Sequence, residues 1–183
     1  MNLSNLKTDL ALESKNGISF LSSAVVIWII FTIIFLLPLD IKLKNIFMLC
    51  FSGITFPLAI VFSKLFQVDW KSRGLPLSDL GLVLNLAQLM YFPILLLVFV
   101  RFPSDMAAVF AIITAAHLYP YGWLYQAKPY SLYAPVISIL IMILGFISGD
   151  RPWIIPLVMA TSLVLLNLAL FADLKKKLSS RSS

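Results

Sequence analysis

The chain of 183 residues is too apolar and too poor in charge for a soluble domain. Hydrophobic residues make up 61% of it and charged residues 12%, and the mean hydropathy is +0.98, whereas a soluble domain carries about 25% charged residues. The net charge of +6 does not indicate nucleic-acid binding, because no basic soluble face is left to hold a duplex. Length, composition and charge therefore predict one integral membrane domain over residues 1–183, with no separate soluble catalytic domain.

Six stretches contain no Asp, Glu, Lys or Arg, and each is long enough to cross a bilayer. A helix needs about 20 mainly apolar residues for this. The charge-free stretches are 16–39, 45–63, 80–100, 106–127, 129–149 and 152–172. They predict membrane spans at 18–39, 45–66, 80–100, 106–121, 130–148 and 153–172. The first stretch is too long for the apolar region of a signal peptide, so we expect it to be a retained span.

The segments between the spans predict how the helices pair. Short turns follow the first, third and fifth spans, which predicts an all-α transmembrane bundle of six helices arranged as three antiparallel hairpins. Pro57 predicts a kink inside the second span. Residues 1–16 carry Leu3, Leu6 and Leu10 at helical spacing, which fits either a helix on the membrane surface or a disordered tail. In the inner loop 67–79, Trp70 is expected to anchor the chain at the interface.

The distribution of basic residues predicts the orientation in the membrane. With a cytoplasmic N-terminus, the inner segments hold ten Lys and Arg residues and the outer segments hold four. The inner ones include Lys71, Arg73 and the cluster 175–177. We expect the cluster 175–177 to lie against anionic lipid heads. Because cytoplasmic segments are enriched in Lys and Arg, we expect both termini to be cytoplasmic.

Metal and cofactor chemistry has little support in the sequence. The chain has one cysteine, Cys50, and one histidine, His117. A single cysteine forms no internal disulfide, and this pair is too few for an ordinary zinc site. We therefore expect no metal and no cofactor.

The polar residues inside the spans are the main functional clue, because such groups are costly in hydrocarbon. Asn85 and Gln88 share one face of the third span, and Thr114, His117 and Tyr121 share one face of the fourth. Counting outwards from the turn at 102–103 places Gln88 and His117 at equal depth, close enough to hydrogen-bond. The pattern predicts a polar, aromatic cavity in the cytoplasmic half, open towards the cytoplasm. The alternative is that these groups only hold helices together.

The predicted cavity defines a set of candidate ligand-binding residues. Their neutral amides and imidazole offer hydrogen bonds, and their aromatic rings suit an apolar or cationic ligand. The candidates are Asn85, Gln88, Tyr91, Thr114, His117, Tyr121, Trp123 and Tyr125.

Three sequence runs in and around the third and fourth spans resemble an uncharacterised family of small bacterial membrane proteins. The runs are LSDLG at 77–81, NLAQLMYFP at 85–93 and AIITAAHLYPYGWLY at 111–125. The resemblance covers about residues 70–150. It implies six spans in a bacterial inner membrane and transfers no catalytic residue.

Three functional classes remain open from the sequence. The leading hypothesis is a small transporter, channel or ligand-binding membrane protein that contacts membrane lipids and a small molecule or ion. The second is an intramembrane enzyme acting on a lipid with His117 as general base, although no catalytic partner is evident. The third is an accessory or assembly protein without a ligand. No nucleic acid is expected, and a homo-oligomer is possible under each hypothesis.

Overall fold

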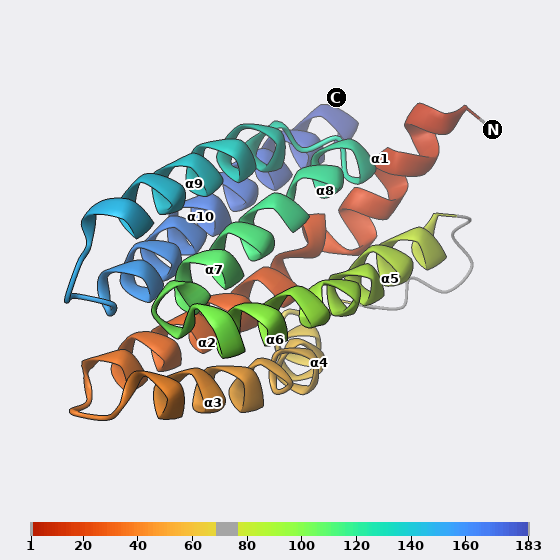
Figure 1. Ribbon diagram of the computed structural model, residues 1–183. Coiled ribbons are helices and arrows are strands. Elements are labelled where there is room, and N and C mark those ends of the chain that lie inside the picture. The colour runs from red at the N-terminus through yellow and green to blue at the C-terminus, as the bar shows by residue number, and fades with distance from the viewer. Residues whose placement is uncertain (1, 69–76, 183) are drawn as a thin grey trace.

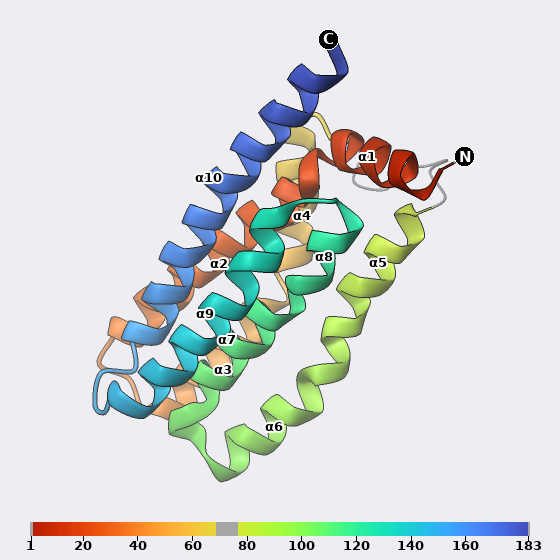
Figure 2. The ribbon, with the colours of Figure 1, turned by 90° about the horizontal axis from the view of Figure 1, so that it is seen from above.

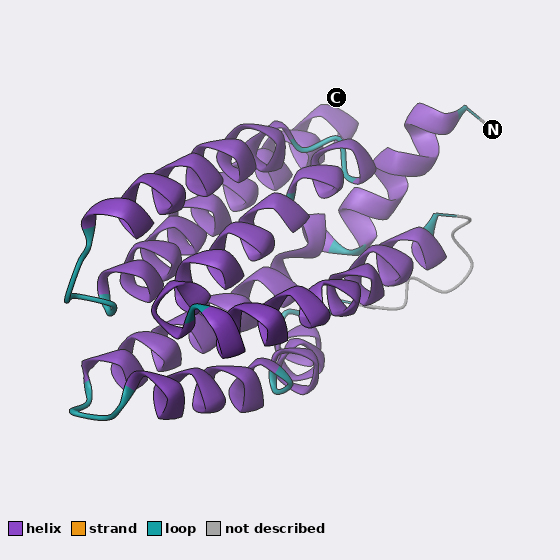
Figure 3. Cartoon of the chain, viewed as in Figure 1, coloured by secondary structure: helices purple, strands orange, loops and turns teal. Residues whose placement is uncertain are grey.

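The computed structural model describes residues 2–68 and 77–182, and the described residues form helices joined by short turns, with no strand among them (Figure 3). The expectations for Trp70, Lys71 and Arg73 lie outside the described residues. Within residues 2–68 and 77–182, five helices or merged helices are long and apolar enough to cross a membrane: Lys15–Leu36, Ser78–Arg101, Pro103–Leu124, Lys128–Ile147 and Ile154–Ser179. A sixth candidate is a bent pair, Ile41–Ser52 with Thr55–Leu65.

The first half of the chain contains four α-helices before the undescribed segment. Helix α1 covers Leu3–Glu13 and is capped by the side chain of Asn2. The short 3-10 helix η1, Lys15–Gly17, turns the chain into α2, Ile18–Leu36. Helices α3, Ile41–Ser52, and α4, Thr55–Leu65, then return along α2.

The second half begins at α5, Ser78–Ala87, and continues through η2, Gln88–Tyr91, into α6, Phe92–Arg101. The chain reverses at η3, Pro103–Asp105. It then runs through α7, Met106–His117, and α8, Tyr119–Leu124. Helices α9, Lys128–Ile147, and α10, Ile154–Ser182, form the last hairpin.

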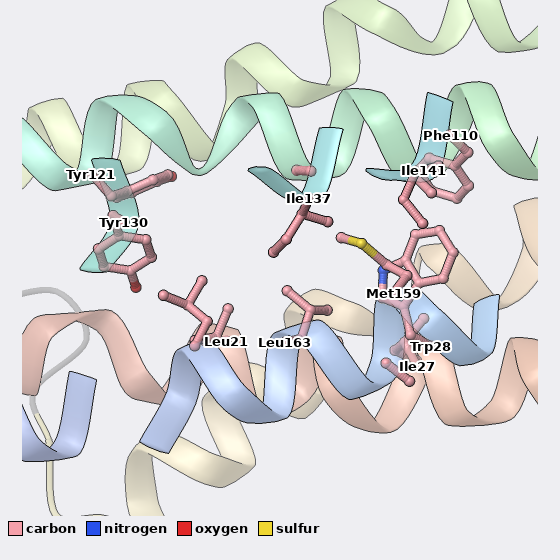
Figure 4. Close-up of a cluster of buried hydrophobic side chains, with 14 of the residues drawn as sticks. Leu21, Ile27, Trp28, Phe110, Tyr121, Tyr130, Ile137, Ile141, Met159 and Leu163 are labelled. Carbon is pink, nitrogen blue, oxygen red and sulfur yellow. The ribbon is translucent and has the colours of Figure 1, made fainter. Parts of the chain in front are cut away.

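The helices pack side by side into one elongated bundle (Figures 1 and 2). Helix α2 packs against α10 and α4, and α7 packs against α9. Their shared core includes Trp28, Phe110, Ile141, Met159 and Leu163, and Figure 4 shows these side chains meeting between the helices. The α5–η2–α6 span is much less buried than the others, and its α5 end stands away from the bundle in Figure 2.

The second span is broken, not continuous over 45–66, and the break differs from the predicted one. Helices α3 and α4 meet at an angle of 44°, at Gly53 and Ile54. Pro57 instead lies in the first turn of α4. A proline is tolerated there because its missing N–H would have no partner inside the helix. The third span also departs from an even α-helix. The 3-10 helix η2 directly precedes α6, whose second residue, Pro93, cannot donate a backbone hydrogen bond.

The N-terminal segment is helical over Leu3–Glu13, which agrees with the predicted helix and not with the alternative of a disordered tail. Leu10 and Ala11 of α1 are buried, and the Lys7 ammonium lies 3.1 Å from the centroid of the Trp123 ring. Arg181 near the C-terminus forms an ion pair of 3.3 Å with Asp9. Both termini therefore lie at the same end of the bundle, beside α8 (Figure 1).

Candidate functional site

The bundle encloses a cavity of about 360 Å³ between α2, the α3–α4 break, α5–η2 and α7–α8. Small-molecule sites have volumes of about 300–1,000 Å³ and are mostly apolar, with a few polar groups. The cavity matches this description in size. Its lining is mainly aromatic and aliphatic, with polar groups from the α5–η2 and α7–α8 segments.

Six of the eight candidate residues line this one cavity. They come from two consecutive spans, in the segments α5–η2 and α7–α8, and they comprise two amides, one hydroxyl, one imidazole and two phenols. They are Asn85, Gln88, Thr114, His117, Tyr121 and Tyr125.

The two other candidate residues, Tyr91 and Trp123, lie outside the cavity lining. Tyr91 ends η2 and is 41% exposed. Trp123 is 55% exposed, and the ammonium of Lys7 from α1 lies over its ring. A helix of six residues carries both Trp123 and Tyr121, so the two rings point in different directions.

Gln88 and His117 face the same cavity but do not hydrogen-bond to each other. His117 Nε2 lies 3.4 Å from the Tyr121 hydroxyl. The Asn85 amide donates to the carbonyl of Gly81 at 2.9 Å, and the Thr114 hydroxyl donates to the carbonyl of Phe110 at 2.9 Å. Among the described residues, none forms a hydrogen bond with the Gln88 side chain. The hydrogen bond that counting allowed between Gln88 and His117 is therefore absent among the described residues.

The apolar wall of the cavity comes largely from α2, which the sequence analysis did not select. Trp28, Phe31 and Phe110 form a cluster, with ring centroids 5.2–6.1 Å apart. Phe20 packs edge-on against Phe56 of α4, at 5.9 Å. These residues gave no signal in the sequence, because apolar side chains facing lipid and apolar side chains facing a cavity look alike.

Three tyrosine rings close the cavity at the end near the termini. Tyr121, Tyr125 and Tyr130 have centroids 5.9–6.2 Å apart, and all three are buried. Figure 4 shows Tyr121 and Tyr130 at one end of the core, far from Trp28. Burial raises the pKa of the Tyr125 hydroxyl to about 12, so it stays protonated at neutral pH. The opening of the cavity was expected at this end, where the structure has buried rings.

The backbone at Gly17 permits this closure. Lys15, Asn16 and Gly17 all have positive φ, and a Cβ added to Gly17 would lie 2.9 Å from Tyr125 Cε2. Left-handed backbone and close approach are the two conditions under which glycine is favoured. Gly17 therefore lets the start of α2 pack directly on the Tyr125 ring.

A polar cluster lies behind the tyrosine rings. The buried Asn16 amide donates to Asp173 at 3.0 Å, and the Tyr130 hydroxyl donates to the Asn16 carbonyl at 2.9 Å. Lys177 donates to the side chain of Asn16 and to the carbonyl of Tyr125, and it pairs with Asp173 at 2.7 Å. Lys177, which was expected against lipid heads with its neighbours, is instead mostly buried in this cluster.

The chemistry available in the cavity is neutral. No Asp, Glu, Lys or Arg is among the lining residues, all of which fall within the described ranges. The described residues also contain no group of three or more His, Cys, Asp or Glu placed to hold a metal ion. The arrangement offers hydrogen bonds from neutral groups at one end and aromatic contacts along the other walls.

Comparison with known proteins identifies the family of the chain. No curated protein and no solved structure matches it. The model of a family of unknown function, DUF7010, matches residues 3–173, which extends well beyond the region of the resemblance noted in the sequence. The chain, with apolar helices suited to a membrane, therefore belongs to the DUF7010 family.

Proposed function

We propose that this protein is a ligand-binding protein of a bacterial inner membrane, and that it holds a small uncharged molecule in its cavity. The observation that carries the proposal is the volume of about 360 Å³ into which Gln88 and His117 both face. A bundle in which these groups served only to join helices would fill this space with side chains, because protein interiors are close-packed.

The groups lining the cavity favour a neutral ligand. An ion buried without a partner of opposite charge is very costly, and the cavity lining has no charged side chain to supply one. The Gln88 amide and the His117 imidazole offer both donors and acceptors of hydrogen bonds. Trp28, Phe31 and Phe110 would contact the apolar part of the ligand.

The orientation predicted from the basic residues belongs to the same proposal. With ten basic residues on one side and four on the other, both termini would be cytoplasmic. The position of both termini at one end of the bundle supports a shared side of the membrane, and the basic residues favour the cytoplasmic one. Cys50→Ser removes the single cysteine, after which Ser4→Cys and Asp150→Cys report on opposite ends. In intact spheroplasts, an impermeant maleimide should label Asp150→Cys and leave Ser4→Cys unlabelled. The reverse pattern would contradict this orientation.

Thermal stability of the purified protein against a panel of uncharged small molecules and lipids tests ligand binding. A ligand that binds only the folded state raises the unfolding temperature as its concentration increases. At a concentration of 100 times Kd, the free energy of unfolding rises by about 2.7 kcal/mol. We expect at least one compound to stabilise the wild type, and the effect to be reduced in Gln88→Leu and His117→Ala. Thr161→Val is the matched control, since Thr161 is exposed on α10 away from the cavity.

The unliganded variants separate binding from helix association. The side chain of Gln88 makes no hydrogen bond with the described residues, so Gln88→Leu should leave the stability of the empty protein unchanged. If no compound stabilises the wild type and Gln88→Leu unfolds at a much lower temperature, the polar groups join helices and the proposal fails.

A further inference from the structure

The walls of the cavity differ in how they are covered. The wall near the termini consists of buried tyrosine rings with the polar cluster of Asn16, Asp173 and Lys177 behind them. A molecule entering from that end would have to displace both. The side between the α3–α4 break and α5–η2 is different, because lining residues there are exposed.

Four exposed residues border this side, and we call it the lateral opening. Phe56 is 40% exposed, Leu86 is 50% exposed and Leu89 is 54% exposed, although all three line the cavity. Gly53, at the α3–α4 break, is exposed as well and adds no side chain. The border of the opening is therefore apolar.

Helix packing explains why this side is open. Outside its own span, α5 packs against α8, and η2 packs against α7. In the described chain, neither α5 nor η2 has comparable contact with α3 or α4. The 44° bend between α3 and α4 leaves a concave border opposite them, and α5 stands away from its neighbours (Figure 2).

The opening lies partway along helices of membrane-spanning length. Leu86 and Leu89 lie near the middle of the Ser78–Arg101 span, and Gly53 lies at the middle of the bent pair. In a membrane these positions are at the depth of the hydrocarbon, where water-soluble ions are scarce. The molecules that reach such an opening are those dissolved in the bilayer.

We infer that the cavity opens sideways into the hydrocarbon between Gly53–Phe56 and Leu86–Leu89, and that its ligand is an uncharged amphiphile dissolved in the membrane. The inference rests on the proposed function and specifies its ligand class. The polar head of the amphiphile lies against Asn85, Gln88 and His117. Its apolar body lies along Trp28, Phe31 and Phe110 and extends through the opening towards the lipid.

Fluorescence quenching by brominated lipid tests the opening without knowledge of the ligand. Trp28 lines the cavity and is 2% exposed, so lipid outside the bundle does not contact it. A variant that retains only Trp28 (Trp70→Phe, Trp123→Phe, Trp153→Phe) is placed in vesicles of phosphatidylcholine brominated midway along its acyl chains. We expect Trp28 to lose most of its emission relative to unbrominated vesicles, because acyl chains enter the cavity.

A substitution at Gly53 supplies the matched test. Its backbone is right-handed, and an added Cβ would meet only the Cys50 carbonyl, at an ordinary 3.6 Å. Gly53→Phe should therefore fold, fill the opening and restore Trp28 emission. Ile54→Phe, at the adjacent exposed residue that does not line the cavity, should leave the quenching unchanged.

Two results would overturn the inference. One is an unquenched Trp28 in vesicles where a tryptophan placed at the lipid-exposed Leu97 is quenched. The other is quenching that Gly53→Phe leaves in place, since lipid would then reach Trp28 by another route. Thermal stabilisation reports binding and not the route of entry. A ligand that stabilises the protein while Trp28 stays unquenched would therefore refute the opening and leave the proposed function standing.

Discussion

The substitution Gly17→Ala should strongly destabilise the protein, although it adds a single methyl group. The residue has φ +73°, where an L-residue with a Cβ costs about 1–2 kcal/mol more than glycine. The new methyl would also lie 2.9 Å from Cε2, 3.2 Å from the hydroxyl oxygen and 3.3 Å from Cζ of Tyr125. Overpacking of this kind costs about 1–3 kcal/mol.

The Tyr125 ring cannot move away from the added methyl group without losing contacts with its neighbours. Its ring stacks on Tyr121, packs against Tyr130 and is buried, so a rotation away from Gly17 would break these ring contacts. The two effects together predict a loss of about 2–5 kcal/mol in the free energy of unfolding. Reversible unfolding in mixed micelles, followed by circular dichroism, measures this loss.

Gly53→Ala is the control for Gly17→Ala. Gly53 has φ −64°, and its added Cβ would make only an ordinary contact of 3.6 Å with the Cys50 carbonyl, so alanine there should be neutral or stabilising by up to about 1 kcal/mol. If Gly17→Ala were as stable as the wild type, the close packing of η1 on Tyr125 would be refuted. If both variants lost equal stability, the loss would not come from backbone conformation or from Tyr125.

Three further substitutions and one control variant test other parts of the structure. Asp173→Asn should lower the free energy of unfolding by about 1.5–3 kcal/mol, because it weakens charged hydrogen bonds in the mostly buried cluster of Asn16 and Lys177. The control, Asp9→Asn, alters an exposed pair with Arg181 and should change the free energy of unfolding by less than about 0.5 kcal/mol in the same assay. Equal losses in the two variants would contradict this prediction. Lys7→Met should make the first turns of α1 more accessible to protease, because it removes the ammonium over Trp123; unchanged cleavage rates would show that α1 is held by other contacts. Gly122→Ala should reduce folded yield, since its Cβ would overlap the Ser131 hydroxyl, and a normal yield would indicate that α8 and α9 pack less closely.

The sequence predicted the helices well because the physical requirement is simple. A bilayer demands about 20 apolar residues in each span, and five of the six predicted spans correspond to single candidate spans. The break in the second span was misplaced, because a proline signals a break only when it lies beyond the first helical turn. Pro57 lies within that turn, so the bend falls at Gly53 and Ile54.

The candidate site was predictable only in its polar part. Polar residues are rare in membrane spans, so Asn85, Gln88 and His117 stood out against an apolar background. Trp28 and Phe31 did not, because lipid and cavity walls are equally apolar. The closure at Gly17 was also missed. It depends on Asn16, Tyr130, Asp173 and Lys177, which the fold brings together from distant parts of the chain.

The most direct test of the account is to detect the bound molecule itself. Native mass spectrometry of the protein released from its membrane should show an adduct of one uncharged amphiphile per chain. Ala24→Phe, which places a ring in the cavity, should lose the adduct. Ala116→Leu, at an exposed residue of α7 outside the cavity lining, should keep it. No adduct on the wild type, or the same adduct on both variants, would contradict the claim that this cavity binds a ligand.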